Sequence, residues 1–431
     1  MNTDLAHLIL NIISIALAGV FLIFASPYVF FYFLTFIKER KIPKSDKLTR
    51  FAVLVPARNE SKVIPNIIKS FKRQTYNKDY FDVYFIIENE DDPSKIIAEE
   101  NGYKAFVRTR LTDERRTKGF ALQECIEYLK ENNLKYDAYV IFDADNVVEE
   151  NFFEVMNNIR QKGVEVAIAY RNYTNANKNF FTASSSIFFS YMNNVTSKAR
   201  TILFKKAVLM GTGYYVNADI IDEAGGWIFT GMTEDTELTT YCYKHNIRMK
   251  YTKRTCVYDE QAEDYKTFHN QLVRWIWGYL IRSKPEKPTN PRDHGCNKKF
   301  IYNVSKIEYH ISFIPMAVVI AGLTVIGITY FILGFLSLGL GGDYYKMFFY
   351  GLLYLLLVIT IFALQSFGQI IREGKRIRIG IFFGITISFI FWLYYFNLIL
   401  AVFDGLFHKE KRTSWKVITH KGNITNKKAR K

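Results

Sequence analysis

Four long apolar stretches constrain this chain most, because each is longer than an ordinary core helix. They cover about residues 8–36, 311–338, 345–367 and 379–403 of the 431. A helix needs about 20 residues to cross the hydrocarbon core of a bilayer, so each stretch is long enough to span a membrane. Charged residues still make up 23% of the chain. We therefore expect a sizeable water-soluble domain attached to an α-helical transmembrane region.

The basic residues indicate how these helices are oriented. Positive charge follows the first stretch at residues 38–41 and recurs at 282–299 and 372–378. By the positive-inside rule these flanks are cytoplasmic, which predicts a multi-pass plasma-membrane protein with a cytoplasmic domain between the first two stretches. The first stretch lacks a basic start and a cleavage site, so we expect an uncleaved anchor.

The basic tail at residues 408–431 conflicts with a count of four crossings. Its charge predicts a cytoplasmic location, whereas a single crossing by the fourth stretch would put it outside. Either the fourth stretch re-enters the membrane without crossing it, or the number of spans differs. The sequence leaves both alternatives open.

The net charge of +16 predicts an anionic neighbour. Because the basic residues cluster beside the apolar stretches, we expect membrane lipids rather than nucleic acid in that role. The four cysteines form no CxxC pair and have no histidines at zinc spacing, which predicts reduced thiols: Cys125, Cys242, Cys256 and Cys296.

After the first membrane stretch, short apolar runs alternate with helical segments. Strands are predicted at residues 51–55, 84–87, 105–107, 139–142 and 166–169, with helices at 59–70, from 94 and after 118. This alternation predicts an α/β domain whose parallel sheet is covered by helices on both faces. Ligands of such sheets bind at the carboxyl ends of the strands.

Acidic residues gather at two of these strand ends. The second predicted strand runs into Glu88 and Asp92, and the fourth runs into Asp143 and Asp145. Carboxylates at this density suit Mg²⁺ or Mn²⁺ shared with substrate phosphates. The alternative is that they only cap the helices that follow.

Two polar segments come later in the chain. Residues Gly211, Thr212 and Gly213 form a loop in which the glycines let the backbone approach a ligand closely. Glu234 and Asp235 precede an amphipathic run at 236–244, and on their own they indicate the start of a helix.

The sequence QLVRW, from Gln271 to Trp275, lies in an amphipathic stretch at residues 264–283. Its aromatic residues and cations are typical of a helix that lies on a lipid surface. The alternative, compatible with the first, is that Gln271, Arg274 and Trp275 hold a substrate. A second interfacial helix is predicted at residues 187–205.

In chain order, these segments read PARNE, ENEDD, Lys118-Gly119, DAD, GTG, TED and QxxRW. That order resembles the processive family 2 glycosyltransferases, which include cellulose, hyaluronan, chitin and poly-N-acetylglucosamine synthases. The resemblance covers about residues 51–279. It implies a GT-A-like, Rossmann-like fold, a UDP-sugar donor, and Mn²⁺ or Mg²⁺ as cofactor.

The resemblance also implies roles for matching residues. Those expected at the nucleotide sugar and its metal are Glu88, Asp92, Lys118, Asp143, Asp145, Gly211, Thr212 and Gly213. Asp145 is the more direct metal ligand. Asp235, with Glu234 beside it, matches the catalytic base of the TED motif. The residues expected to grip the diphosphate and the acceptor sugar are Gln271, Arg274 and Trp275. Apart from the resemblance, the aromatic rings of Tyr214 and Tyr215 offer further stacking surfaces for a sugar. Trp415 in the tail is a weaker match.

We therefore expect an inverting hexosyltransferase that extends a β-linked polysaccharide and translocates it. The expected units are an anchor at 1–41, a catalytic domain at 42–262, an interfacial helix and basic linker at 263–300, channel helices at 301–407 and a tail at 408–431. The expected partners are the UDP-sugar, the growing polysaccharide, membrane lipids and an accessory subunit or second copy. The rivals are a transferase that adds one sugar to a lipid and, more remotely, a non-catalytic transport or scaffold protein.

Overall fold

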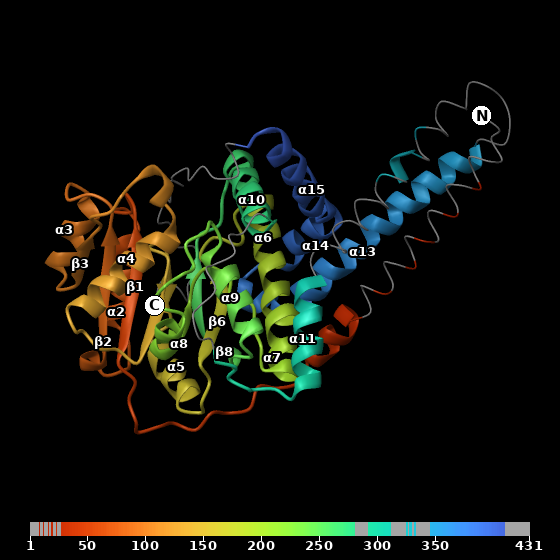
Figure 1. The fold of residues 1–431 in the computed structure, drawn as a ribbon. Coiled ribbons are helices and arrows are strands. Elements are labelled where there is room, and N and C mark those ends of the chain that lie inside the picture. The colour runs from red at the N-terminus through yellow and green to blue at the C-terminus, as the bar shows by residue number, and fades with distance from the viewer. Residues whose placement is uncertain are drawn as a thin grey trace.

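The structure is a computed structural model that describes residues 27–280, 292–311 and 345–409, with a few residues of 8–23 and 325–332. Its α/β domain lies at one side, a group of helices lies beside it, and α13 (Tyr345–Ile377) projects away from both (Figure 1). Most of the second expected membrane stretch and Trp415 lie outside the described residues, as does about half of the first stretch.

An eight-stranded sheet forms the centre of the domain, in the order β3-β2-β1-β4-β7-β6-β8-β5. The strands are β1 (Phe51–Ala57), β2 (Phe81–Ile87), β3 (Lys104–Val107), β4 (Ala138–Ile141), β5 (Val147–Val148), β6 (Val166–Tyr173), β7 (Tyr214–Asn217) and β8 (Met249–Asp259). The prediction of a parallel sheet is correct for β1 to β4. It is wrong for β7, which lies antiparallel between β4 and β6. A turn with positive φ at Gly211 and Gly213 leads into this four-residue strand, which is too short to have a clear period.

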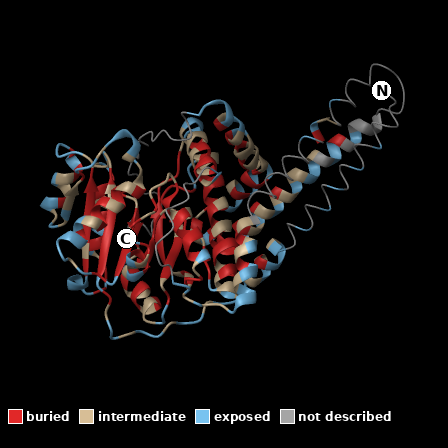
Figure 2. Cartoon of the chain, viewed as in Figure 1, coloured by how far each residue is buried: buried red, intermediate tan, exposed pale blue. Residues whose placement is uncertain are grey.

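Helices cover both faces of the sheet, because residues of its strands are apolar on both sides. In β1, Ala52 and Leu54 belong to one buried cluster, and Phe51, Val53 and Val55 belong to the other. The first cluster is closed by α4 (Lys118–Glu131), α8 (Ala218–Glu223) and α9 (Glu234–Lys244), and the second by α2 (Ile64–Lys72), α3 (Pro93–Glu100) and α5 (Phe152–Arg160). Figure 2 shows the buried residues running through the centre of the domain. The four cysteines are free thiols, as predicted.

Several helices lie beside this domain, between it and most of α13 (Figure 1). They are α6 (Phe180–Tyr191), the π-helical turn η3 (Met192–Lys198), α7 (Ala199–Phe204), α10 (Tyr265–Leu280) and α11 (Lys299–Ile311). The helix predicted at 264–283 corresponds to α10, and the one predicted at 187–205 falls within α6, η3 and α7. Two short 3₁₀ turns, η1 (Lys78–Tyr80) and η2 (Asp113–Arg115), lie in loops of the α/β domain.

Among the described residues, only Gly351–Ile377 of α13 forms a single helix long and apolar enough to cross a membrane. The fourth expected stretch is not one straight helix. It forms α14 (Ile381–Ile390) and α15 (Trp392–Phe407), which meet at an angle of 45° and reach the length of a span only together.

Close packing holds α15 against α10. The indole nitrogen of Trp277 donates to the carbonyl of Val402 at 3.2 Å, and His269 Nε2 lies 2.9 Å from the carboxylate of Asp404. A Cβ atom on Gly405 would lie 1.9 Å from the Trp277 indole nitrogen, so only glycine permits this approach. The last described helix therefore lies against the helix that carries the QxxRW sequence.

Candidate active site

One continuous cavity of about 1090 Å³ runs from the carboxyl ends of the strands to α13 and α15. Pockets for single small ligands usually measure about 300–1,000 Å³, so this cavity is large. It brings together most of the expected site residues: Glu88, Lys118, Asp143, Asp145, Gly211, Glu234, Asp235, Gln271, Arg274 and Trp275. The wall is acidic at the sheet and mostly aromatic and aliphatic at the far end.

The end of β4 places the Asp-x-Asp sequence at the mouth of the sheet. The backbone N–H of Asp143 donates to Asn146 Oδ1 at 3.1 Å and to Thr212 Oγ1 at 3.0 Å. The hydroxyl of Thr212 also bonds Asn146. These bonds fix the turn after the strand, so that both carboxylates meet the cavity. Thr212 thus supports the site from behind and is not on the cavity wall.

Lys118, at the start of α4, joins three segments of the site. Its ammonium lies 2.5 Å from Asp143 Oδ1, 2.6 Å from the carbonyl of Gly211 and 3.4 Å from Glu234 Oε1. Burial opposes its charge, yet the carboxylates of Asp143 and Glu234 raise the pKa of Lys118 above its usual range. A Cβ on the next residue, Gly119, would lie 2.2 Å from the carbonyl oxygen of Phe229. Glycine there lets α4 approach the segment that leads to Glu234.

The TED sequence forms the start of α9, opposite the Asp-x-Asp turn. Burial raises the pKa of Glu234 to about 7, while Lys118 opposes the rise. Burial also raises the pKa of Asp235, whose Oδ1 accepts the N–H of Thr236 at 2.8 Å. A carboxylate at a helix N-terminus is stabilised by the helix dipole. Both interpretations of this sequence therefore hold: it begins a helix and presents Asp235 to the cavity.

The cavity wall carries further carboxylates: Glu60, which the sequence marks only as part of PARNE, and Asp259 and Glu260, which the sequence interpretation missed. Burial raises the pKa of Glu60 to about 7, with added repulsion from Asp143, Asp92 and Glu260. Burial and the charge of Asp259 raise the pKa of Asp145 well above its usual range. The sequence did contain a signal for Asp259 and Glu260. Both stand at the end of the apolar strand β8, much as the Asp-x-Asp sequence comes after β4.

The carboxylate oxygens on this wall suit a divalent cation that takes its remaining ligands from water and from substrate phosphates. Among residues 27–280, 292–311 and 345–409, no three His, Cys, Asp or Glu side chains converge as a complete metal site. Mg²⁺ and Mn²⁺ usually keep waters and take one or two carboxylates with substrate phosphates. Asp143 and Asp145 both line the cavity and supply such oxygens.

Glu88 and Asp92 lie in different surroundings. Glu88 lines the cavity, 3.0 Å from Arg58 Nε and 3.8 Å from Arg108 Nη1. Asp92 does not line it: its carboxylate accepts the N–H of Asn59 at 2.8 Å and caps α3 through Ser94 at 2.9 Å. Asp92 therefore shapes the loop after β1, and the capping alternative holds for it.

The face of α10 closes the cavity opposite the sheet. Gln271, Arg274 and Trp275 all line it, and the Trp275 ring packs edge-on against Phe189 with centroids 5.4 Å apart. Burial lowers the pKa of the Arg274 guanidinium, and the charges of Glu234 and Asp143 partly offset this shift. The QxxRW sequence thus faces both acidic motifs across the cavity.

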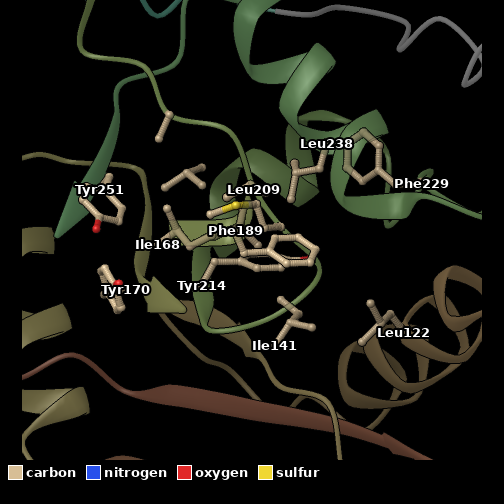
Figure 3. Close-up of a cluster of buried hydrophobic side chains, with 14 of the residues drawn as sticks. Leu122, Ile141, Ile168, Tyr170, Phe189, Leu209, Tyr214, Phe229, Leu238 and Tyr251 are labelled. Carbon is tan, nitrogen blue, oxygen red and sulfur yellow. The ribbon is translucent and has the colours of Figure 1, made fainter. Parts of the chain in front are cut away.

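Three expected positions belong to the core of the domain. Gly213 has φ +69° and packs against Val257, where a Cβ would come within 2.8 Å. Tyr214 and Tyr215 are fully buried in β7, and Tyr214 lies in the apolar cluster of Figure 3. The expectation that these tyrosines stack on a sugar is wrong, because both faces of this strand are covered.

Two acidic segments, the Asp-x-Asp turn after β4 and the start of α9, meet at the ammonium of Lys118 on the wall of this cavity. The sequence profile of the family described as "Glycosyltransferase like family 2" matches residues 49–278, more than half of the chain. The chain therefore belongs to this family, and the prediction of a glycosyltransferase is confirmed.

Known relatives are similar to this chain over the same domain. The probable glycosyltransferase YdaM of Bacillus subtilis is 27% identical over 259 residues, 58% of this chain and 60% of YdaM. The β-monoglucosyldiacylglycerol synthase of Nostoc sp. is 26% identical over 231 residues, 53% of this chain and 48% of that protein. The match thus spans about half to 60% of the length of these relatives.

A solved structure supports the fold. The mannosyltransferase PcManGT from Pyrobaculum calidifontis, in complex with GDP-Man and Mn²⁺, superimposes with a TM-score of 0.52 at 14% identity. The match covers 80% of this chain and 96% of that structure. The expected GT-A-like fold is therefore confirmed.

Proposed function

We propose that the chain is a membrane-embedded, inverting glycosyltransferase that extends a β-linked polysaccharide from UDP-glucose or UDP-N-acetylglucosamine. The observation that carries this proposal is the single cavity that joins the acidic strand ends to aromatic side chains of α10, α13 and α15. A nucleotide sugar alone does not need a cavity of about 1090 Å³, whereas a donor together with a growing chain does.

In this proposal the acidic end binds the donor. Asp143 and Asp145 would hold Mn²⁺ or Mg²⁺, and such a cation, when bound, neutralises the diphosphate as it leaves. Arg274 binds the same diphosphate, because its guanidinium fork matches phosphate oxygens. Lys118 keeps Asp143 and Glu234 oriented through its two ion pairs.

Asp235 is the proposed general base. Asp235 lines the same cavity as Asp143, Asp145 and Arg274. It takes the proton of the acceptor hydroxyl while that oxygen attacks the anomeric carbon, as a positioned carboxylate does in general base catalysis. The bond to the diphosphate breaks on the opposite side, so an α-linked donor gives a β-linked product.

The far end of the cavity offers flat surfaces for an acceptor chain. Trp275 and Phe189 form one aromatic pair there, and Phe362 of α13 stacks on Tyr395 of α15 with centroids 4.1 Å apart. The C–H faces of sugar rings pack well on aromatic rings, and successive rings along a path suit a polymer.

A second candidate function is the transfer of one sugar to a membrane lipid. Aliphatic side chains also line the far end, among them Val358, Leu398 and Ile399. Val29 lines it too and is 57% exposed. An acyl chain suits this lining, and the Nostoc relative is named β-monoglucosyldiacylglycerol synthase.

We also propose that α14 and α15 do not cross the membrane, so that the tail lies on the side of the catalytic domain. The end of α13 is held by that domain, since Asn172 of β6 donates to the carbonyl of Arg376 at 3.1 Å. α14 then returns along α13 until Ser388 meets Ser366 at 3.0 Å. Ser366 is three turns from the end of α13, roughly 17 Å along its axis, about half of a ~30 Å hydrocarbon core. From there α15 packs on α10.

The product distinguishes the two candidate functions. We expect the purified full-length chain in nanodiscs, supplied with Mn²⁺ and each labelled UDP-sugar in turn, to make a high-molecular-weight product that a linkage-specific hydrolase digests. A product of one sugar on a lipid would support the second candidate instead. If no nucleotide sugar gives any product, both candidates are wrong and a non-catalytic role remains.

A further inference from the structure

A π-helical turn lies between α6 and α7, at Met192–Lys198. Turns of this kind are rare and occur mostly near functional sites. Its extra residue turns two neighbouring side chains in different directions, Asn193 toward the sheet and Asn194 toward α13. Both side chains are fully buried. A buried amide needs partners for its donors and its acceptor, so the partners of these two residues tell what the turn holds in place.

Asn193 holds the backbone of Arg171 in β6. Its Oδ1 accepts the N–H of Arg171 at 3.3 Å, and its Nδ2 donates to the carbonyl of Arg171 at 2.9 Å. β6 pairs with β7 only as far as Ile168, and the N–H of Ala169 still reaches Gly213 at 2.9 Å. At Arg171, two residues further along β6, this edge no longer pairs with β7. The side-chain amide of Asn193 there makes the backbone hydrogen bonds that a neighbouring strand would make.

The side chain of Arg171 in turn holds Asp259. Its Nε donates to Asp259 Oδ2 at 2.9 Å, its Nη2 bonds the same carboxylate, and its Nη1 donates to the carbonyl of Met210 at 3.0 Å. The guanidinium also lies over the ring of Phe189, 4.5 Å from its centroid. These contacts leave Arg171 a single orientation on the cavity wall.

Asp259 lies close to the Asp-x-Asp turn, since burial and then the negative charge of Asp259 raise the pKa of Asp145. The backbone N–H of Glu260 reaches Asp145 Oδ2 at 3.4 Å. Two carboxylates in contact repel each other unless a cation offsets one of them. Arg171 supplies that cation on the side of Asp259, which keeps Asp145 facing the cavity.

We propose that Asn193 and Arg171 are positioning residues of the donor site: Asn193 fixes Arg171, Arg171 fixes Asp259, and Asp259 sets the orientation of Asp145. The inference rests on the proposed function, because it assigns these residues to the binding of a divalent cation and the nucleotide diphosphate. Neither residue belongs to a motif that the resemblance marks, and neither needs to touch the substrate.

Asn194 provides a matched control in the same turn. Its Nδ2 donates to the carbonyl of Ser190 at 3.0 Å and to Glu373 Oε1 of α13 at 3.1 Å. It is as buried as Asn193 and is also an asparagine, but its bonds lead away from the donor carboxylates. Asn194→Ala therefore reports what a merely structural loss in this turn does.

The test is Mn²⁺ binding to the full-length protein in nanodiscs, followed by the electron paramagnetic resonance signal of the free ion, with and without UDP. Residues behind a metal ligand typically change metal affinity by about 10- to 100-fold when altered. We expect Asn193→Ala and Arg171→Lys to weaken Mn²⁺ binding by about 10-fold or more. Asn194→Ala should leave it within about 2-fold, even where its melting temperature falls as much as that of Asn193→Ala.

Each outcome decides one point. Equal losses of affinity in Asn193→Ala and Asn194→Ala, or unchanged affinity in Asn193→Ala, would overturn the inference alone. If Asn193→Ala does not fold, Arg171→Lys decides, since it keeps the charge and loses the fork. A wild-type protein that binds no Mn²⁺ would overturn the proposed donor site and this inference with it.

Discussion

The ammonium of Lys118 lies 2.5 Å from Oδ1 of Asp143 in a buried part of the cavity wall. This contact joins the first residue of α4 to the end of β4, and the same ammonium reaches Glu234 at the start of α9. Three segments that are far apart in the sequence thus share one cation. The acidic wall depends on it for part of its charge balance.

Lys118→Met is expected to destabilise the domain, because it leaves the buried carboxylate of Glu234 and the partly exposed carboxylate of Asp143 without their cation. Removing one partner of a fully buried ion pair typically costs about 3–5 kcal/mol, and the exposure of Asp143 to solvent makes the expected loss smaller than that. Adding Asp143→Asn should recover part of the loss, since it removes one of the stranded charges. Thermal unfolding in detergent measures both. The control is Lys130→Met, which breaks a surface pair with Asp222 and should change little.

The stability of the domain is expected to fall as pH rises. The pKa of Glu60 is about 7 in the folded protein and its usual value is 4.5. The folded state therefore holds a proton that the unfolded state has lost between about pH 4.5 and 7, and the free energy of unfolding decreases across that window. Glu60→Gln should flatten the decline and be more stable than wild type at pH 8. A melting temperature that responds equally to pH in both proteins would contradict this account.

Activity is expected to require a divalent cation. Excess EDTA should abolish sugar transfer, and Mn²⁺ or Mg²⁺ should restore it. Asp145→Asn should need a much higher Mn²⁺ concentration for half-maximal activity, since it replaces one anionic oxygen ligand. Full activity of the wild-type protein in EDTA would show that the acidic wall serves another purpose.

The side of the membrane on which α15 ends can be measured by labelling. Lys409→Cys, just after α15, should react with a membrane-impermeant maleimide in the same vesicle orientation as Lys130→Cys on the catalytic domain. Both variants are made with Cys296→Ser, because Cys296 is the only one of the four cysteines that is not buried. Labelling of Lys409→Cys and Lys130→Cys in opposite orientations would show that α14 and α15 cross the membrane.

Much of the site could be predicted because each motif follows a recognisable local pattern. The Asp-x-Asp sequence follows an apolar strand, Glu234 begins a helix, and QxxRW lies on an amphipathic helix. The same logic missed Asp259, although it ends β8 in the same way. Arg171 left no local signal, since its role depends on Asn193, which the chain brings to it across a π-helical turn.

The parts that the sequence could not predict depend on packing over long distances. Asp92 reads like a ligand, but its oxygens accept backbone N–H groups of Asn59 and Ser94. The pairing of β7 follows from the turn at Gly211 and Gly213. The bend between α14 and α15 leaves no mark in hydropathy, because both helices are apolar. The position of α15 against α10 includes the close approach of Gly405 to Trp277, a tertiary contact that hydropathy does not reveal.

The most direct test of the account is sugar transfer by Asp235→Asn beside the wild-type protein. Purified full-length proteins receive the labelled UDP-sugar that the wild type uses, with Mn²⁺, and the label in product is counted over time. Asp222→Asn, on the exposed surface of α8, serves as the control. The account predicts that Asp235→Asn lowers transfer by about 10²-fold or more, as expected for loss of a general base, while Asp222→Asn stays near wild type. Transfer by Asp235→Asn within a few-fold of wild type would contradict the proposed mechanism.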